Sequence, residues 1–210
     1  MIEIKKVAID LLMRTQSARV LVAIAGIPGS GKSTFAENIA KELSLAGASS
    51  VVVPMDGFHY SKAQLDGMKD PAEAHRRRGA PFTFDAAALI SLVSALKAHS
   101  THSIFAPSFD HNLGDPTPQA IEIPSSTRFI ILEGLYLHLS FSPWNELTFD
   151  ERWFLLCDED VAINRLVFRH VKTSVAKNEA EAIERILGSD MVNGRIVLEN
   201  RVACDLEFEN

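Results

Sequence analysis

Short apolar runs alternate with longer stretches of helical spacing along most of the chain. The runs are rich in β-branched or aromatic residues, which is typical of strands. They predict buried strands at 19–25, 50–54, 127–134 and 152–157, and a further short strand at 103–111. After a turn-rich loop, a small strand at 119–123 would pair with the one at 103–111. Apolar and acidic residues alternate at 204–208, which predicts a half-exposed edge strand.

Apolar residues at three- and four-residue spacing predict helices between the strands. The clearest is 34–46, where Phe35, Ile39 and Leu43 recur every four residues and Gly47 stands where a helix would end. An amphipathic helix over 3–16 precedes the first strand. Further helices are predicted at 71–78, from Asp85 through Leu96, from Asp158 through His170, at 178–187 and at 191–201.

Residues 26–33 read G-x-x-x-x-G-K-S and lie between the first strand and the helix at 34–46, the context expected of a phosphate-binding loop. Glycines let successive backbone N–H groups turn toward anionic oxygens, and the helix N-terminus adds its positive end. We expect Lys32 to reach the β- and γ-phosphates of a nucleotide and Ser33 to ligate Mg²⁺. The predicted nucleotide contacts are Gly26, Pro28, Gly29, Ser30, Gly31, Lys32, Ser33 and Thr34. A loop that merely joins strand to helix is the weaker alternative.

Two acidic residues follow predicted strands at the edge where open α/β sheets bind ligands. Asp56 comes after the valine run, and a carboxylate there could accept the proton of an attacking hydroxyl. The Asp56-Gly57 pair could equally be a turn signal. Glu133 ends the strand at 127–134, as in a Walker-B element whose carboxylate reaches Mg²⁺. An acid that only caps the strand is the alternative.

Arginine residues occur in two groups. Arg165 and Arg169 are four residues apart on one helix, so they share a face and would suit triphosphate oxygens. Isolated surface arginines would mean little by comparison. Arg76, Arg77 and Arg78 form a charge run, and a solvated helix face is the favoured interpretation of it.

Composition limits the classes of protein that the chain can belong to. The 210 residues, 47% hydrophobic and 23% charged, suit one globular domain spanning 1–210. A net charge of −6 argues against a general nucleic-acid binder. Residues 1–6 lack a signal-peptide layout, and no apolar run approaches a membrane span, so we expect a cytoplasmic protein without membrane insertion. Cys157 and Cys204 are expected to be buried free thiols.

The motifs together resemble the uridine kinase / phosphoribulokinase / bacterial pantothenate kinase group of P-loop kinases, in particular its branch labelled fructose transport-system kinase. Besides the phosphate-binding loop, the segments that carry the resemblance are 55–60 (MDGFHY), 78–85 (RGAPFTFD), 107–111 (PSFDH), 131–135 (ILEGL) and 165–170 (RLVFRH). The resemblance implies a P-loop NTP hydrolase fold of the α/β class, with a mostly parallel central sheet and helices on both faces. It also implies a helical lid at about 158–188. The amphipathic N-terminal helix, within 1–17, precedes the part that the resemblance covers, and we expect it to pack on the domain.

By this resemblance Asp56 corresponds to the catalytic aspartate and Glu133 to the acid near magnesium and substrate. Arg165 and Arg169 correspond to lid arginines that close on the phosphates. His59, Arg78 and Asp110 fall in segments that line the acceptor pocket, together with Asp56 and Glu133. The chain departs from the group in two places. Gly57-Phe58-His59 replaces the S-F-Y of uridine kinases, and Lys172-Thr173-Ser174 stands where the favoured branch carries a glycine after R-H-V.

The sequence therefore predicts an ATP- and Mg²⁺-dependent kinase that phosphorylates a hydroxyl of a small metabolite. The acceptor stays open among a sugar such as fructose, a nucleoside and a pantothenate-like alcohol. One alternative is a GTP-dependent switch, but the chain has no N-K-x-D segment. Another is a non-catalytic nucleotide-binding regulator associated with a transport system. Whether the chain works as a homodimer is also left open.

Overall fold

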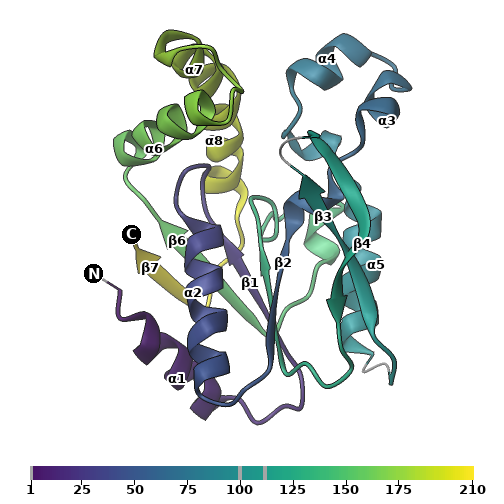
Figure 1. Ribbon diagram of the computed structural model, residues 1–210, viewed down its shortest axis with the longest axis vertical. Helices are drawn as coiled ribbons and strands as arrows, with labels where there is room; N and C mark the ends of the chain where they lie inside the picture. The colour runs from purple at the N-terminus through teal and green to yellow at the C-terminus, as the bar shows by residue number, and fades with distance from the viewer. Residues whose placement is uncertain (1, 99–100, 111–112) are drawn as a thin grey trace.

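The computed structural model describes residues 2–98, 101–110 and 113–210. A five-stranded sheet with strand order β2-β5-β1-β6-β7 runs through the molecule, and every neighbouring pair in it is parallel (Figure 1). Its strands are β1 (Val20–Ala25), β2 (Ser50–Pro54), β5 (Phe129–Glu133), β6 (Glu151–Leu156) and β7 (Leu206–Glu209). The order places β1 at the centre, where all of its residues are buried.

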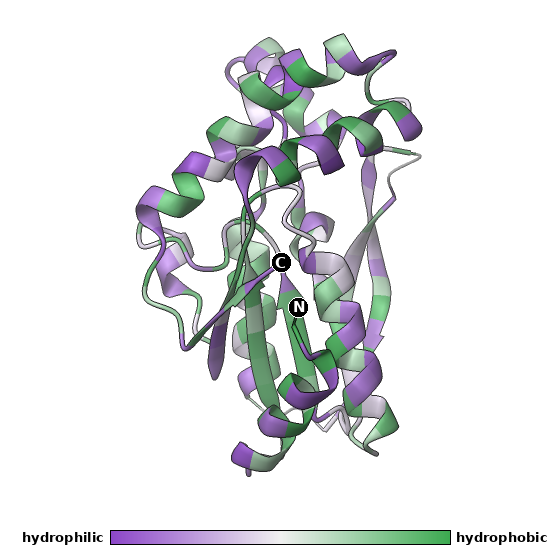
Figure 2. Cartoon of the chain, turned by 90° about the vertical axis from the view of Figure 1, so that its left-hand side faces the viewer, coloured by the Kyte–Doolittle hydropathy of each residue, from purple (hydrophilic) through white to green (hydrophobic). Residues whose placement is uncertain are grey.

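Helices cover both faces of the sheet because each central strand is apolar on both sides. On one face, α1 (Ile4–Arg14) and α2 (Lys32–Leu45) pack against Val20, Val22 and Ile24 of β1. On the other, α5 (Ala86–Lys97) packs in a cluster with Leu21 and Ala23. Figure 2 shows the central strands of the sheet coloured mostly hydrophobic, while the helices carry mixed colours. The predicted α/β fold is therefore confirmed.

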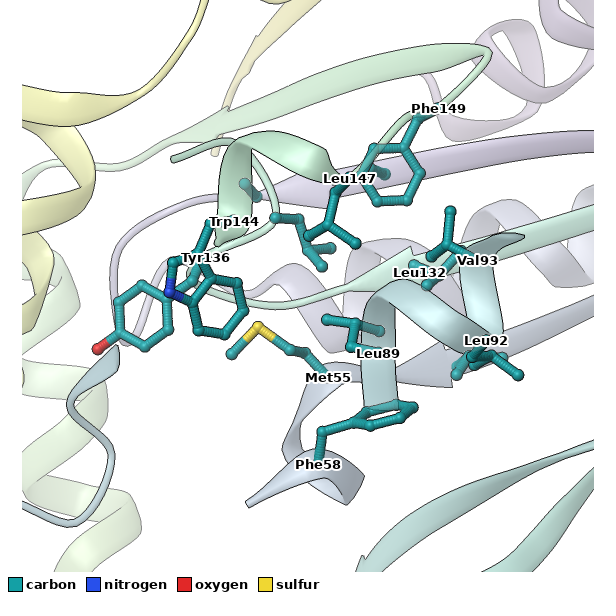
Figure 3. Close-up of a cluster of buried hydrophobic side chains, with 14 of the residues drawn as sticks. Met55, Phe58, Leu89, Leu92, Val93, Leu132, Tyr136, Trp144, Leu147 and Phe149 are labelled. Atoms are coloured by element: carbon teal, nitrogen blue, oxygen red, sulfur yellow. The ribbon is translucent and has the colours of Figure 1, made fainter. Parts of the chain in front are cut away.

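The cluster on the α5 side reaches the edge of the sheet where β5 ends. Met55 packs among Leu89 of α5 and the rings of Tyr136 and Trp144 (Figure 3). The Tyr136 hydroxyl lies at the border of the cluster and donates to the carbonyl oxygen of Gly79 at 2.5 Å. A Cβ on Gly134 would overlap the Met55 side chain, so only glycine fits directly after Glu133.

The segment between β2 and β5 leaves the main sheet. It contains the 3₁₀ turn η1 (Met55–Phe58), the short helices α3 (Lys62–Asp66) and α4 (Pro71–Arg76), the turn η2 (Pro81–Thr83) and helix α5. A hairpin of β3 (Ile104–Asp110) and β4 (Asp115–Ile123) follows and forms a separate two-stranded sheet. One further 3₁₀ turn, η3 (Trp144–Glu146), lies between β5 and β6.

A helical segment follows β6 and stands at the top of the molecule in Figure 1, opposite α3 and α4. It consists of α6 (Glu159–Lys172), α7 (Glu179–Arg185), a π turn η4 (Ile186–Asp190) and α8 (Met191–Asn200). Leu166, Ala176, Ala182, Ile186 and Met191 form a small apolar cluster of its own. The lid predicted at 158–188 lies within this segment, and this apolar cluster is separate from the two clusters that flank the sheet.

The backbone at the end of α6 replaces the expected glycine in an informative way. Ser174, in the segment Lys172-Thr173-Ser174 where the favoured branch carries a glycine after R-H-V, has φ 58°, in the left-handed region. Val175 N–H then donates to the carbonyl oxygen of His170 at 2.9 Å, which ends the helix. The chain therefore makes the glycine-type turn with a serine.

Most predicted elements are confirmed within a few residues, and three predictions are wrong in part. Strand β2 is an edge strand in which only Val53 is buried, because the segment after it turns away from the sheet. The loop predicted at 112–118 is shorter, since β4 already starts at Asp115; His111 and Asn112 lie outside the described residues. Cys157 and Cys204 are free but only half-buried, because they lie at strand ends. In the described part of the chain, the longest helices are too short or too polar to cross a membrane.

Candidate active site

The register of the sheet brings the predicted site segments together at one edge. Glu133, the last residue of β5, pairs with Ile24 of β1 and with Pro54 of β2. The phosphate-binding loop begins two residues after Ile24, and Asp56 lies two residues after Pro54. Because parallel strands end at the same edge, the loop, Asp56 and Glu133 converge there.

The phosphate-binding loop has the conformation that its glycines predict. Gly29 and Gly31 have φ of 77° and 91°, and α2 starts at Lys32 directly after Gly31. A Cβ on Gly29 would overlap the carbonyl oxygen of Ala162 in α6, so the loop and α6 are in close contact. Lys32 Nζ donates to the carbonyl oxygen of Ile27 at 2.9 Å, which holds the ammonium at the loop.

A cavity of about 230 Å³, here called the phosphate cavity, opens above the start of α2. Arg165 and Arg169 of α6 face it, and Arg165 Nη1 lies 3.4 Å from the carbonyl oxygen of Ser30. Three cationic side chains therefore gather on one small cavity. Its lining residues are Gly29, Gly31, Lys32, Ser33, Thr34, Arg165, Leu166 and Arg169. Gly26, Pro28 and Ser30 shape the loop without lining this cavity; Ser30 is fully buried.

The charges of Lys32, Asp56 and Glu133 influence one another. Burial raises the pKa of Glu133 to about 7, and the negative charge of Asp56 adds to this increase, while Lys32 and Ser33 oppose it. Burial also lowers the pKa of Lys32 to about 8, against the attraction of Glu133 and Asp56. Such coupled, perturbed groups are common at functional sites.

Ser33 and Glu133 have the oxygen atoms that magnesium prefers. Ser33 Oγ donates to Glu133 Oε1 at 3.0 Å, so a hydroxyl and a carboxylate point at the same place. Within the described ranges no three His, Cys, Asp or Glu side chains cluster as a complete metal site. Mg²⁺ in such sites takes one or two carboxylates and completes its shell with phosphate oxygens and water, so the residues fit the ion.

A second cavity of about 380 Å³, here called the acceptor cavity, lies on the other side of Arg169. It brings together Asp56, His59 and Arg78, three residues that the sequence predicts for the acceptor. Arg169 lines both cavities. The remaining lining residues are Phe109, Gly114, His170, Thr173, Val175 and Arg185.

Two predicted acceptor residues do not line the acceptor cavity. Glu133 is 6% exposed and lies on the side of Ser33. Asp110 ends β3 and accepts a hydrogen bond from the Leu113 N–H at 3.2 Å. The structure therefore connects Asp110 with the turn of the hairpin.

The solvated-face interpretation of the charge run holds only for Arg76, which is exposed and pairs with Glu73 at 2.6 Å. Arg78 instead donates to the carbonyl oxygens of Tyr60, at 2.8 Å, and Gly114, and pairs with Asp115 at 3.0 Å. The interpretation is wrong for Arg78, because the chain leaves the helix before this residue and turns it toward the hairpin.

His59 is held at the border of the acceptor cavity by aromatic rings. Its ring centroid lies 3.9 Å from that of Phe84 and 4.9 Å from that of Phe109. His59 Nδ1 lies 2.9 Å from the carbonyl oxygen of Asp56. The side chain also borders a larger, mostly apolar cavity of about 650 Å³ between η1, α5 and the hairpin.

Comparison with known proteins agrees with this geometry. A sequence profile described as the Phosphoribulokinase / Uridine kinase family matches residues 21–181. The chain belongs to this family. A Schizosaccharomyces pombe protein named "Putative uridine kinase C227.14" is 40% identical over 206 residues, covering 96% of this chain and 87% of the relative. As a member of the family, the chain is a P-loop kinase and thus a phosphotransferase.

Solved structures show the same architecture. The crystal structure titled "putative fructose transport system kinase" from Silicibacter sp. TM1040 has a TM-score of 0.88 and 33% identity, covering 99% of this chain and 100% of that chain. YFH7 of Saccharomyces cerevisiae, described as "a putative P-loop containing kinase with a circular permutation", has a TM-score of 0.90 and 24% identity, with 100% and 99% of the chains covered. The latter likeness supports the fold alone.

The structure adds residues to the kinase site that the sequence analysis missed. A third cavity of about 380 Å³ adjoins the phosphate cavity through Gly31, Thr34 and Arg165. Asn38 and Asn210 line it, and Asn210 Nδ2 donates to the carbonyl oxygen of Ser30 at 2.7 Å. Asn38 could have been found, since it lies one helical turn after Thr34. Asn210 carries no such signal, because only the pairing of β7 with β6 brings it to the loop.

Proposed function

We propose that this P-loop kinase transfers the γ-phosphoryl group of ATP to a hydroxyl of a small metabolite, with Mg²⁺ as the metal. The proposal rests on the position of Arg169, whose side chain lines both the phosphate cavity and the acceptor cavity. Phosphoryl transfer requires mainly positioning and neutralisation of charge between the two reactants. A guanidinium at the border of both cavities suits that requirement.

The nucleotide would extend over the phosphate cavity and the third cavity. The amide groups of residues 29–34, Lys32 and the two arginines of α6 would hold the phosphates. The third cavity offers apolar surface from Ile4 and Phe35 and amide groups from Asn38 and Asn210, which suit a nucleobase and ribose. Arg165 lines both cavities and would contact the nucleotide where they join.

Ser33 and Glu133 would hold Mg²⁺, whose positive charge offsets that of the phosphate oxygens. Glu133 has a raised pKa because its carboxylate is buried beside Asp56. A neighbouring cation favours the ionised carboxylate, so metal binding and ionisation of Glu133 support each other.

Asp56 would orient the acceptor hydroxyl and take its proton. The acceptor oxygen bonds to the γ-phosphorus as the bond to the bridging oxygen of the β-phosphate breaks, and the proton moves to the Asp56 carboxylate. His59 and Arg78 would shape the acceptor cavity. A sugar such as fructose is the acceptor suggested by the name of the Silicibacter relative; a nucleoside and a pantothenate-like alcohol are the alternatives. A cytoplasmic location, where ATP is available, stays part of the proposal.

The test is a screen of hydroxyl-bearing metabolites for acceptor-dependent ADP formation from ATP and Mg²⁺. Asp56→Asn should lower the turnover of the best acceptor by about 10²- to 10⁴-fold, because the variant cannot take the proton. The affinity for ATP should stay within about two-fold, since Asp56 lines the acceptor cavity and not the phosphate cavity. Normal turnover in the variant would contradict the role of Asp56, and a screen without any acceptor would contradict the kinase proposal.

A further inference from the structure

The acceptor cavity has an excess of cationic groups on its wall. Three of its lining residues are arginines, Arg78, Arg169 and Arg185, whereas Asp56 is its one carboxylate among the residues that the structure describes. Asp56 has a task of its own in the proposed reaction, which is to bind the hydroxyl. The excess of positive charge therefore needs another explanation.

Two of the three guanidinium groups are accounted for. Arg78 pairs with Asp115 at 3.0 Å and bonds to two carbonyl oxygens, so its charge is balanced within the protein. Arg169 also lines the phosphate cavity, where triphosphate oxygens would match it. Arg185 is the last residue of α7 and is exposed. Its guanidinium has no ion pair and no hydrogen bond among the described residues. An exposed arginine by itself often needs no partner.

The second observation concerns His170, which lines the same cavity and has a buried ring nitrogen without a hydrogen-bond partner among the described residues. The imidazole is 5% exposed, and its Nδ1 has no hydrogen-bond partner among the described residues. Its Nε2 lies 3.7 Å from Asp190 Oδ2, which is beyond hydrogen-bond distance. Buried polar groups are nearly always satisfied in folded proteins, so an exception on a cavity wall points to a ligand atom.

On this side of the cavity Arg185 supplies the positive charge, and His170 supplies an uncharged ring. Burial lowers the pKa of His170 to about 4, and the charges of Arg169 and Arg185 add to this decrease. The ring is thus neutral at pH 7, with one N–H donor. Asp190 stands beside His170 without lining the cavity; burial raises its pKa, while Arg185 and Arg169 oppose that increase. A ligand in the cavity would meet a guanidinium and a neutral imidazole on this side.

We propose that the phosphoryl acceptor carries an oxyanion, a carboxylate or a phosphate monoester, in addition to its hydroxyl, and that Arg185 and His170 bind this oxyanion. The inference rests on the proposed kinase function and narrows its substrate class. Arg185 belongs to the helical segment after β6, whereas Asp56 belongs to the segment after β2. An acceptor held at both ends would therefore bridge the two sides seen at the top of Figure 1.

The experiment compares matched acceptors that differ only in the anionic group. The pairs are glycerol with glycerate, glucose with glucuronate, and ribose with ribose 5-phosphate, so that the carboxylate and phosphate arms separate the two oxyanions. ADP formation gives kcat/KM, and ³¹P NMR identifies the product. We expect the charged member of at least one pair to be preferred by about 10- to 100-fold, the value of one or two charge-assisted hydrogen bonds.

The variant Arg185→Gln then tests the contact itself. It should raise the KM for the charged acceptor about ten-fold or more and leave the KM for ATP unchanged, because Arg185 does not line the phosphate cavity. Arg195→Gln is the matched control, since Arg195 is an exposed arginine of α8 that does not line the acceptor cavity.

The outcomes separate the inference from the function on which it rests. Preference for the uncharged members, or an unchanged acceptor KM in Arg185→Gln, would overturn the oxyanion site and leave the kinase intact. ATP binding without transfer to any acceptor, in these pairs or in the wider screen, would overturn the kinase proposal itself. Equal effects of the Arg185 and Arg195 substitutions would show general electrostatics and would also overturn the site.

Discussion

Replacing Glu133 with glutamine should stabilise the ligand-free protein at high pH while removing the proposed metal ligand. Glu133 is 6% exposed, and burial raises its pKa from 4.5 to about 7. In the unfolded chain the same carboxyl group loses its proton near its ordinary value. At a pH between these two pKa values, Glu133 holds a proton in the folded protein and has released it in the unfolded chain.

The direction of the pH dependence follows from this difference. The contribution of Glu133 to stability is fully present below pH 4.5 and is lost as the pH rises toward and through the folded pKa of about 7. Each pKa unit corresponds to about 1.4 kcal/mol, so the complete loss is about 3 kcal/mol. Of this, about 2–3 kcal/mol falls between pH 5 and pH 8 by the same relation.

Lys32 reduces the gain in the variant. Its ammonium is buried beside Glu133, whose charge opposes the decrease in the Lys32 pKa. Glutamine removes that favourable attraction, so we expect Glu133→Gln to gain about 1–2 kcal/mol relative to the original protein on going from pH 5 to pH 8.

Urea denaturation of both proteins at pH 5 and pH 8, without nucleotide or metal, measures this difference. Glu199→Gln is the control, because Glu199 is exposed on α8, and it should show no such pH-dependent gain. If the difference in unfolding free energy between Glu133→Gln and the original protein stayed constant with pH, or decreased toward pH 8, the assignment of a buried carboxyl group with a raised pKa would be wrong. In the presence of Mg²⁺ and ATP the variant should lose most of its turnover.

Three further substitutions test the fold, two near the site and one at the opposite edge of the sheet. Ser174→Gly should raise the unfolding free energy by about 0.5–1 kcal/mol and the melting temperature by about 1–4 °C, because glycine adopts the φ of 58° at this position without strain. Ser91→Gly, inside α5, is the control and should lower both. Gly29→Ala should weaken ATP binding by at least about ten-fold in calorimetric titration, because the new Cβ would overlap the carbonyl oxygen of Ala162; unchanged binding would contradict the close contact of loop and α6. Arg19→Leu should lower the unfolding free energy by about 2–4 kcal/mol, since the buried Arg19 donates to four carbonyl oxygens, whereas Arg76→Leu at an exposed position should change it little.

The local structure of the candidate site could be predicted from the sequence because it depends on contiguous segments. The glycine spacing of residues 26–33 requires a loop with left-handed backbone, and the following helix fixes where its amide groups lie. The apolar runs before Asp56 and Glu133 likewise place both acids at strand ends. Helical periodicity alone put Arg165 and Arg169 on one face of α6.

Only the tertiary structure decided how these segments meet. The parallel register placed Glu133 beside Ile24 and Pro54 and so joined the acids to the loop. Because the chain turns after α4, Arg78 does not share the solvated face of Arg76 and instead contacts Tyr60 and the hairpin residue Asp115. The orientation of α7 places Arg185 at the acceptor cavity. The edge position of β7 places Asn210 at the third cavity. Sequence periodicity reports which face of an element is apolar, but the relative placement of distant elements depends on long-range packing, which no local pattern encodes.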